Sequence, residues 1–161
     1  LLQDWSTQHK LFEVRRVIEP DLAALAARRA TAEQIEKMRT ILAEQQAQIR
    51  QGGTGVRQDT LFHYLLAEAT GNEVLVRIMD SLMDLLLRTR EESLQHDKRP
   101  ARSLKQHRAM LRAIEARNPR AAERLMYQHI AEIEELVFSQ GEQPPAERSA
   151  SPSAPDPGVA A

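Results

Sequence analysis

The hydrophobic positions of this chain recur every three or four residues, the spacing of one face of an α-helix. Nowhere do apolar and polar residues alternate strictly, so no strand is expected. Thr31, Asn72 and Asn118 are the expected N-caps, and Pro20 is expected to kink the first helix. Prolines, glycines and caps divide the pattern into six predicted helices, at residues 11–29, 31–51, 56–69, 72–95, 101–116 and 119–139. Because the connections are short, the predicted fold class is all-α, an antiparallel bundle.

The predicted helix over residues 72–95 differs from the other five. Its apolar side chains cover more than half of its circumference. A helix of this kind either lies at the centre of the bundle or also contacts a partner chain. The central position is the favoured interpretation of the pattern alone.

The composition changes after the last predicted helix. The segment from Gly141 onward holds five of the eight prolines, with serine and alanine between them. A segment of this composition cannot bury enough apolar surface to offset the entropy lost on ordering. Residues 140–161 are therefore predicted to be a disordered tail, and residues 11–139 the folded domain.

Five ionisable side chains lie in or beside the apolar faces of four predicted helices. His107 and His129 fall inside the apolar arcs of the last two helices, and Arg15 lies within the stripe of the first. Asp59 and His63 are spaced i, i+4, so they share one face of their helix, at the border of its apolar arc. Buried ionisable groups are costly unless they are paired, hydrogen-bonded or bound to metal.

Three imidazoles and one carboxylate suit a divalent transition ion. The pair Asp59 and His63 can place two ligands on one ion, and His107 and His129 can close the site from two other helices. The candidate ions are zinc, nickel, manganese and iron, with zinc in first place. Such a site leaves positions open to water or an anion, and Arg15 can hold a carboxylate of a bound ligand.

Two simpler interpretations of the same residues stay open at this point. An inward histidine is more often a satisfied core residue than a metal ligand, which would make the domain a structural interaction module without a metal. An inward arginine is more often part of a buried ion pair, here between Arg15 and Glu19 or Asp59. His9 and His96 lie in predicted loops and are interpreted as solvated.

An enzymatic alternative also stays open. A metal-dependent enzyme acting on a small carboxylate would need a general base near the metal. Glu68, Glu73 and Glu132 are available, but no spacing singles one of them out. The HEXXH motif, the P-loop and the GxGxxG motif are absent from the sequence.

Charge and cysteine content exclude several further classes. The chain has 22 basic and 23 acidic residues, so it shows no excess of the positive charge that most nucleic-acid-binding domains carry. It has no cysteine, which excludes disulfides and thiolate metal sites and is compatible with a cytoplasmic location. No apolar run approaches the length of about 20 residues that a membrane span needs, so no membrane partner is expected.

The chain resembles a known family over residues 11–138. It is similar to the C-terminal effector-binding domain, the FCD domain, of FadR-subfamily GntR transcription regulators. The resemblance rests on the order and spacing of three segments, EVRRVIEPDLAALAARRA, DTLFHYLLAEATGNEVL and KQHRAMLRAIEARNPRAAERLMYQHI. It implies an antiparallel bundle of six or seven helices that senses an effector and has no enzymatic activity.

The resemblance also implies the site. Many members of the family hold a metal on one Asp and three His, which match Asp59, His63, His107 and His129 in this sequence. The arginine that contacts effector carboxylates in relatives matches Arg15. The implied ligands are therefore a divalent metal ion and a small organic acid.

The resemblance further implies partners. Family members mostly form homodimers and carry an N-terminal winged helix-turn-helix that binds DNA. Nothing before Leu11 could form such a domain, so residues 1–10 are expected to be the linker from it. DNA would be contacted through that absent domain and not through this chain, and the effector would change the spacing of the two DNA-binding domains.

Overall fold

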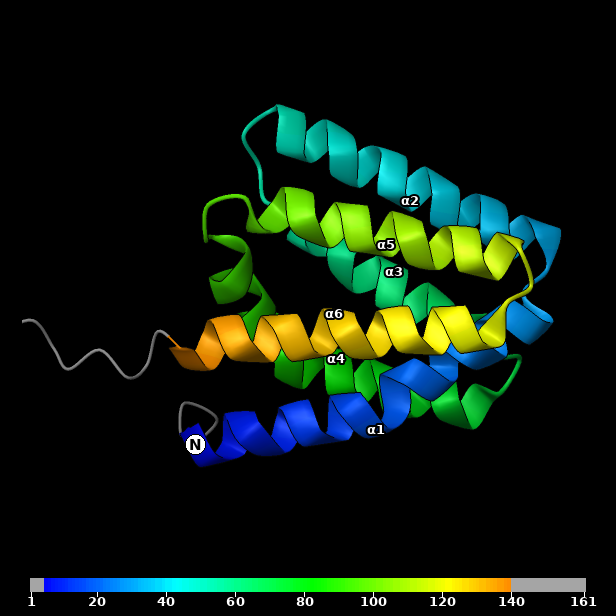
Figure 1. Ribbon diagram of the computed structural model, residues 1–161, viewed down its shortest axis with the longest axis horizontal. Coiled ribbons are helices and arrows are strands. Elements are labelled where there is room, and N and C mark those ends of the chain that lie inside the picture. Colours follow the sequence, from blue (N-terminus) through cyan, green and yellow to red (C-terminus); the bar gives the residue numbers. More distant parts are fainter. Residues whose placement is uncertain (1–4, 140–161) are drawn as a thin grey trace, which may run out of the picture.

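A computed structural model describes residues 5–139 of the protein. These residues form six helices: α1 (Trp5–Arg29), α2 (Ala32–Arg50), α3 (Val56–Glu68), α4 (Glu73–Leu94), α5 (Arg99–Glu115) and α6 (Pro119–Ser139) (Figure 1). No strand occurs within that range. The fold class is therefore all-α, as the hydrophobic spacing predicts. The predicted C-terminal tail, residues 140–161, lies outside the described residues.

The predicted capping residues begin three of the helices. Thr31 Oγ1 accepts a hydrogen bond from the backbone N–H of Gln34 at 3.1 Å, and Gln34 Oε1 accepts one from the backbone N–H of Thr31 at 2.9 Å. The side chains of Asn72 and Asn118 accept bonds from backbone N–H groups two and three residues further along. Each cap satisfies a backbone donor that has no partner within the helix, which explains why the predicted starts are close to the observed ones.

The first helix is longer than predicted. It begins at Trp5, so residues 5–10, which were expected to belong to a linker, are helical. His9, expected in a solvated loop, lies on this helix, and its ring stacks on that of Phe138, with the centroids 3.7 Å and the planes 4° apart. This contact holds the start of α1 against the end of α6. Beyond it α1 continues through Pro20, and its second half turns away from the axis of the first (Figure 1).

The connection before α5 is shorter than predicted. Helix α5 begins at Arg99, two residues before the expected start, with Pro100 in its first turn. Proline is tolerated there because its missing N–H would have no partner within the helix. His96 lies in the connection, as expected, but its side chain is half-buried and not fully solvated.

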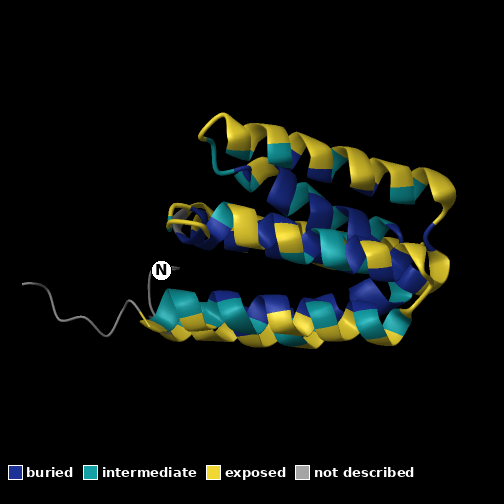
Figure 2. Ribbon diagram, turned by 45° about the horizontal axis from the view of Figure 1, so that its top comes forward, coloured by how far each residue is buried: buried dark blue, intermediate teal, exposed yellow. Residues whose placement is uncertain are grey.

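The helices pack so that each turns one face inward. Helix α6 lies between α1 and α5, and it runs in the opposite direction to both (Figure 1). Buried residues follow the inner faces and exposed residues the outer faces (Figure 2). One apolar cluster joins parts of α1, α2, α3, α5 and α6, and a second joins α1 and α4 with one residue of α3. The polar site described below is built from the helices that these two clusters hold together.

Helix α4 is not the central helix that its composition suggested. Met79, Leu82 and Leu86 are buried on one face, where they pack in the second cluster. Val74, Ile78 and Leu85 are exposed along one flank of this buried stripe, and Leu87 is exposed on its other flank. None of the helices within the described residues is long and apolar enough to cross a membrane.

Candidate metal centre

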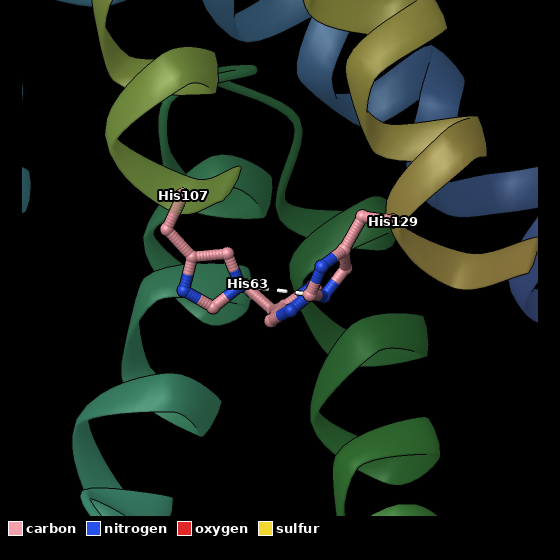
Figure 3. A group of neighbouring side chains, drawn as sticks. All are labelled: His63, His107 and His129. Carbon is pink, nitrogen blue, oxygen red and sulfur yellow. Dashed lines mark hydrogen bonds between the residues drawn. The ribbon is translucent and has the colours of Figure 1, made fainter. Parts of the chain in front are cut away.

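Three histidines from three helices converge inside the bundle (Figure 3). His63 comes from α3, His107 from α5 and His129 from α6, and all three side chains are fully buried. Each offers a ring nitrogen, and these nitrogens all lie within 4.8 Å of one another. We call these three residues the histidine cluster. The sequence predicted all three as candidate ligands, and the fold brings them together.

The spacing within the histidine cluster matches the spacing of ligands on one ion. His107 Nε2 and His129 Nε2 are 3.4 Å apart. Two nitrogens bound to one tetrahedral zinc at about 2.0–2.1 Å would lie about 3.4 Å from each other. The ring centroid of His63 lies 5.0 Å from that of His107 and 5.3 Å from that of His129. The donor set therefore fits a divalent transition ion in both chemistry and spacing.

Neighbouring side chains orient two of the three imidazoles. His63 Nδ1 lies 2.6 Å from Glu19 Oε2 without the alignment of a hydrogen bond, and His63 Nε2 has no hydrogen-bond partner among the described residues. His129 Nδ1 lies 2.8 Å from Gln106 Oε1 and can donate to it. Ligating histidines usually donate their second ring N–H to a carboxylate or carbonyl oxygen, which fixes the tautomer and leaves the other nitrogen for the metal. Glu19 and Gln106 occupy that place here.

Local packing explains the burial of the α3 residues. Asp59 and His63 were expected at the border of an apolar arc, but both are buried. The reason is that α1, α4 and α5 all pack against α3 and cover more of its surface than its apolar residues alone require. The ring of Phe62, next to His63, stacks on His107 with centroids 4.5 Å apart, which closes the cluster on that side.

Asp59 lies beside the histidine cluster, not inside it. Its Oδ1 is 3.8 Å from His107 Nε2 and accepts a hydrogen bond from Ser103 Oγ. Its Oδ2 faces Arg90, with 3.9 Å between Oδ2 and Arg90 Nη1. The expected fourth ligand is therefore adjacent to the cluster on the His107 side, although its distance to His107 exceeds that between His107 and His129.

Arg15 is connected to His63 through Glu19 and is already paired. Its Nε donates to Glu19 Oε1 at 2.6 Å, and both side chains are only 1% exposed. Of the two ion pairs considered from the sequence, the one with Glu19 is present. Glu19 thus accepts from Arg15 on both oxygens, at 2.6 Å on Oε1 and 3.5 Å on Oε2, and its Oε2 also faces His63. Glu19 therefore links α1 to the histidine cluster.

The FCD domain family matches residues 10–132 of the chain. This chain belongs to the FCD domain family. Residues 10–132 include all three residues of the histidine cluster.

The relatives of this FCD domain are bacterial transcription regulators. It is 31% identical over 133 residues to the HTH-type transcriptional regulator LutR of Bacillus subtilis (strain 168), covering 80% of this chain and 61% of the relative. It is 30% identical over 126 residues to the HTH-type transcriptional repressor NanR of Cronobacter sakazakii (strain ATCC BAA-894), covering 75% and 47%. A solved structure, Streptococcus agalactiae GntR, is similar with a TM-score of 0.67 and 26% identity, covering 77% of this chain and 56% of that chain. The chain spans about half to three fifths of the length of these relatives.

Burial keeps the histidines of this FCD domain neutral. Burial and then the charge of Arg90 lower the pKa of His63, although Glu19 opposes the shift. Burial lowers the pKa of His107 to about 3, and burial with the neighbouring imidazoles lowers that of His129 well below its ordinary value. Neutral imidazoles are the form that binds a metal, so the cluster is in its ligating state at neutral pH.

The carboxylates of the site are ionised, and the positive charge of one arginine lowers the pKa of another. Burial raises the pKa of Asp59, but His107 and Arg90 outweigh it and hold that pKa well below the usual range. The same balance holds for Glu19, where Arg15 is the main opposing charge. Burial and the charge of Arg15 lower the pKa of Arg90 to about 10. All of these groups are therefore charged at neutral pH.

The sequence did not single out Arg90, Ser103 or Gln106. Arg90 follows Leu86 by four residues and precedes Leu94 by four, so the buried stripe of α4 would have placed it inward. Ser103 precedes His107 by four and shares its face. Gln106 carries no such signal, because its contact with His129 depends on how α5 packs against α6.

Proposed function

We propose that the chain is the effector-sensing domain of a GntR-type transcription regulator, and that it binds a divalent metal ion and a small organic carboxylate. The observation that best supports this proposal is the buried histidine cluster, in which His63 Nε2 has no hydrogen-bond partner among the described residues. A buried polar atom without a partner is costly, and a bound metal ion removes that cost. The two relatives described above are named as a regulator and a repressor, which supports a sensor over an enzyme.

The metal would be held by His63, His107, His129 and, beside them, Asp59. A bound divalent ion would supply an open coordination position for an oxygen of the effector. Zinc is the leading candidate, and nickel, manganese and iron have suitable ligand preferences as well. Arg15 is proposed to contact the effector carboxylate while Glu19 holds its Nε.

Metal analysis tests the site. The chain is purified without nickel resin, incubated with zinc or manganese, desalted and analysed for bound metal. We expect about one ion per chain, since all the candidate ligands lie in one site. A content below about 0.1 per chain after both additions would overturn the metal part of the proposal and leave a structural module with core histidines.

Effector binding would act on DNA through α1. In the family, α1 follows the DNA-binding domain, which this chain would reach through its N-terminal residues. Helix α1 contacts the site through Arg15 and Glu19, and it contacts α6 through an ion pair between Arg16 and Glu134. An effector that binds one arrangement of these helices more tightly would shift α1 and change the spacing of the DNA-binding domains.

A thermal-shift screen tests the effector class. Small carboxylates are added to zinc-loaded protein, and one that binds the folded state raises the melting temperature. Neutral alcohols of the same carbon number are the control and should cause no shift. Chemical turnover of any acid that binds would favour the enzymatic alternative and overturn the sensor.

The exposed apolar face of α4 supports a homodimer. Val74, Ile78 and Leu85 recur at helical spacing along one flank of α4, and all three are exposed. A patch of this kind on a soluble domain usually marks an interface. We expect light scattering to give twice the chain mass, and Leu85→Glu to give the monomer. Tyr127→Glu, at an exposed position on α6, should leave the dimer intact.

A further inference from the structure

The buried charges of the site do not balance. Five charged side chains are buried within the described residues, namely three arginines and two carboxylates: Arg15, Arg90, Arg99, Glu19 and Asp59. Glu19 is hydrogen-bonded to Arg15. Asp59 is therefore the one buried carboxylate among the described residues that makes no hydrogen bond with an arginine, and the neutral histidines add no negative charge. We call Arg90 and Arg99 the arginine pair.

Arg90 has no hydrogen-bond partner. Its side chain is only 3% exposed, and none of its three guanidinium nitrogens donates a hydrogen bond to another described residue. Its nearest carboxylate oxygen, Asp59 Oδ2, is 3.9 Å from Nη1, which is too far for a hydrogen bond. A guanidinium carries five N–H donors and stays protonated, so burying it without acceptors is unfavourable.

The position of Arg90 relates it to the metal centre. Asp59 faces His107 with Oδ1 and Arg90 with Oδ2. Arg90 therefore lies beside Asp59, and its charge also acts on His63, Glu19 and Arg15. A ligand bound at the cluster that carries a second anionic group could direct that group toward the free nitrogens of Arg90.

Arg99 extends the same region toward the surface. It is 7% exposed, its Nη1 has no hydrogen-bond partner, and it interacts electrostatically with Asp59. It also lines a surface pocket of about 370 Å³ beside the α4–α5 connection and α6. Lys98, Arg102, Asp97 and Glu132 line this pocket as well, and Arg102 is paired with Glu132 at 2.8 Å. Arg99 and Lys98 are therefore the positive side chains of the pocket that a negatively charged ligand would meet.

We propose that the arginine pair binds a second anionic group of the effector, so that the effector is an acid with two anionic groups. This inference rests on the proposed function, because the first carboxylate is the one held at the metal centre. A guanidinium pairs with a carboxylate through two parallel N–H···O bonds, which would satisfy donors that Asp59 does not reach. A monocarboxylate held at the metal and Arg15 would leave Arg90 unpaired.

The test compares acids that differ only in the second carboxylate. Isothermal titration of zinc-loaded protein uses three pairs of equal carbon number: butyrate and succinate, 2-hydroxybutyrate and malate, gluconate and glucarate. In at least one pair the diacid should bind at least about tenfold more tightly, the size expected for a charge-assisted hydrogen bond. Arg90→Gln should abolish this preference while monoacid affinity and zinc content stay the same, and Arg90→Lys should keep part of it.

Arg77→Gln is the matched control, because Arg77 is an exposed arginine on the same helix; it should keep the full preference. Equal binding of monoacid and diacid in all pairs, or a preference that survives Arg90→Gln, would overturn the inference and leave the proposed function standing. Failure of every acid to bind zinc-loaded protein would overturn both.

Stability gives a second, independent readout. In zinc-loaded protein without acid, Arg90→Gln should melt at nearly the same temperature as the parent, because the variant removes a buried guanidinium that makes no hydrogen bond, while zinc bound beside Asp59 supplies positive charge in its place. A melting temperature several degrees lower would show that Arg90 is a structural partner of Asp59, and it would overturn the assignment to an effector.

Discussion

The histidine cluster and the arginine pair are both buried and polar, and Asp59 interacts with members of both. Imidazoles can give up their charge when they are buried, and the pKa values of all three histidines are lowered accordingly. Guanidinium groups keep their charge at neutral pH even though burial lowers the pKa of Arg90 to about 10. The histidine cluster can therefore remain uncharged until it binds a metal, whereas the arginine pair requires a negatively charged partner.

Arg15 shows what a buried arginine needs. It is as deeply buried as Arg90, but Glu19 accepts a hydrogen bond from its Nε at 2.6 Å. The two arginines thus differ in their counter-ion and not in their burial. The first of the following predictions has the largest expected effect, and it removes the hydrogen-bonding carboxylate of Arg15.

Glu19→Gln should have the largest effect, because it makes Arg15 resemble Arg90. It removes the buried anion that faces both Arg15 and His63. Breaking a buried ion pair on one side typically costs about 3–5 kcal/mol, and we expect a loss of that size in urea unfolding. Glu36→Gln, in an exposed pair with Arg39, is the control and should cost less than about 1 kcal/mol. A loss below about 1 kcal/mol for Glu19→Gln would contradict the role of Glu19 as the buried partner of Arg15.

His107→Ala should act on the cluster and spare the fold. It removes one imidazole from the centre of the site, and we expect zinc affinity to fall by about a hundredfold or more, judged against the 10–100-fold typical of losing an outer partner. Circular dichroism should show nearly unchanged helicity. His96→Ala, in the connection before α5, should bind zinc like the parent. Full zinc occupancy in His107→Ala at low free zinc would remove His107 from the ligand set.

The pH dependence separates neutral histidines from charged arginines. In metal-free protein the buried histidines have lowered pKa values, so below about pH 6.5 the unfolded chain binds protons that the folded chain does not. The free energy of unfolding should therefore fall as the pH falls from 8 to 6, by on the order of 2 kcal/mol for three histidines. The arginines do not titrate in this window. Stability that is constant or rises toward pH 6 would show that the histidines are protonated in the folded state.

The sequence predicted what depends on local spacing. Helix starts follow from caps such as Thr31, and the inward direction of His107 and His129 follows from the apolar residues around each of them. The pairing of Arg15 with Glu19 was one of two options because the two residues are four apart on one helix. These predictions need only one helix at a time.

Relations between helices were not predictable in this way. Asp59 and Arg90 meet because α3 packs against α4, and neither sequence segment contains that information. The exposed side of α4 was also mispredicted, since an apolar circumference is equally compatible with a central helix and with a helix that has an open face. The arginine pair can therefore be identified only from the tertiary structure.

Gln106→Ala should have the smallest effect of the four, and it tests whether the cluster needs its outer partners as the arginines need theirs. Gln106 Oε1 lies 2.8 Å from His129 Nδ1, and its Nε2 donates to Glu132. Without this acceptor the imidazole of His129 loses its fixed orientation, and we expect zinc to bind about tenfold more weakly. Gln46→Ala is the matched control, because Gln46 is also half-buried and accepts a hydrogen bond, but from Arg108 and away from the cluster. If both variants bind zinc like the parent, packing alone orients His129, and the cluster depends less on outer partners than Arg15 depends on Glu19.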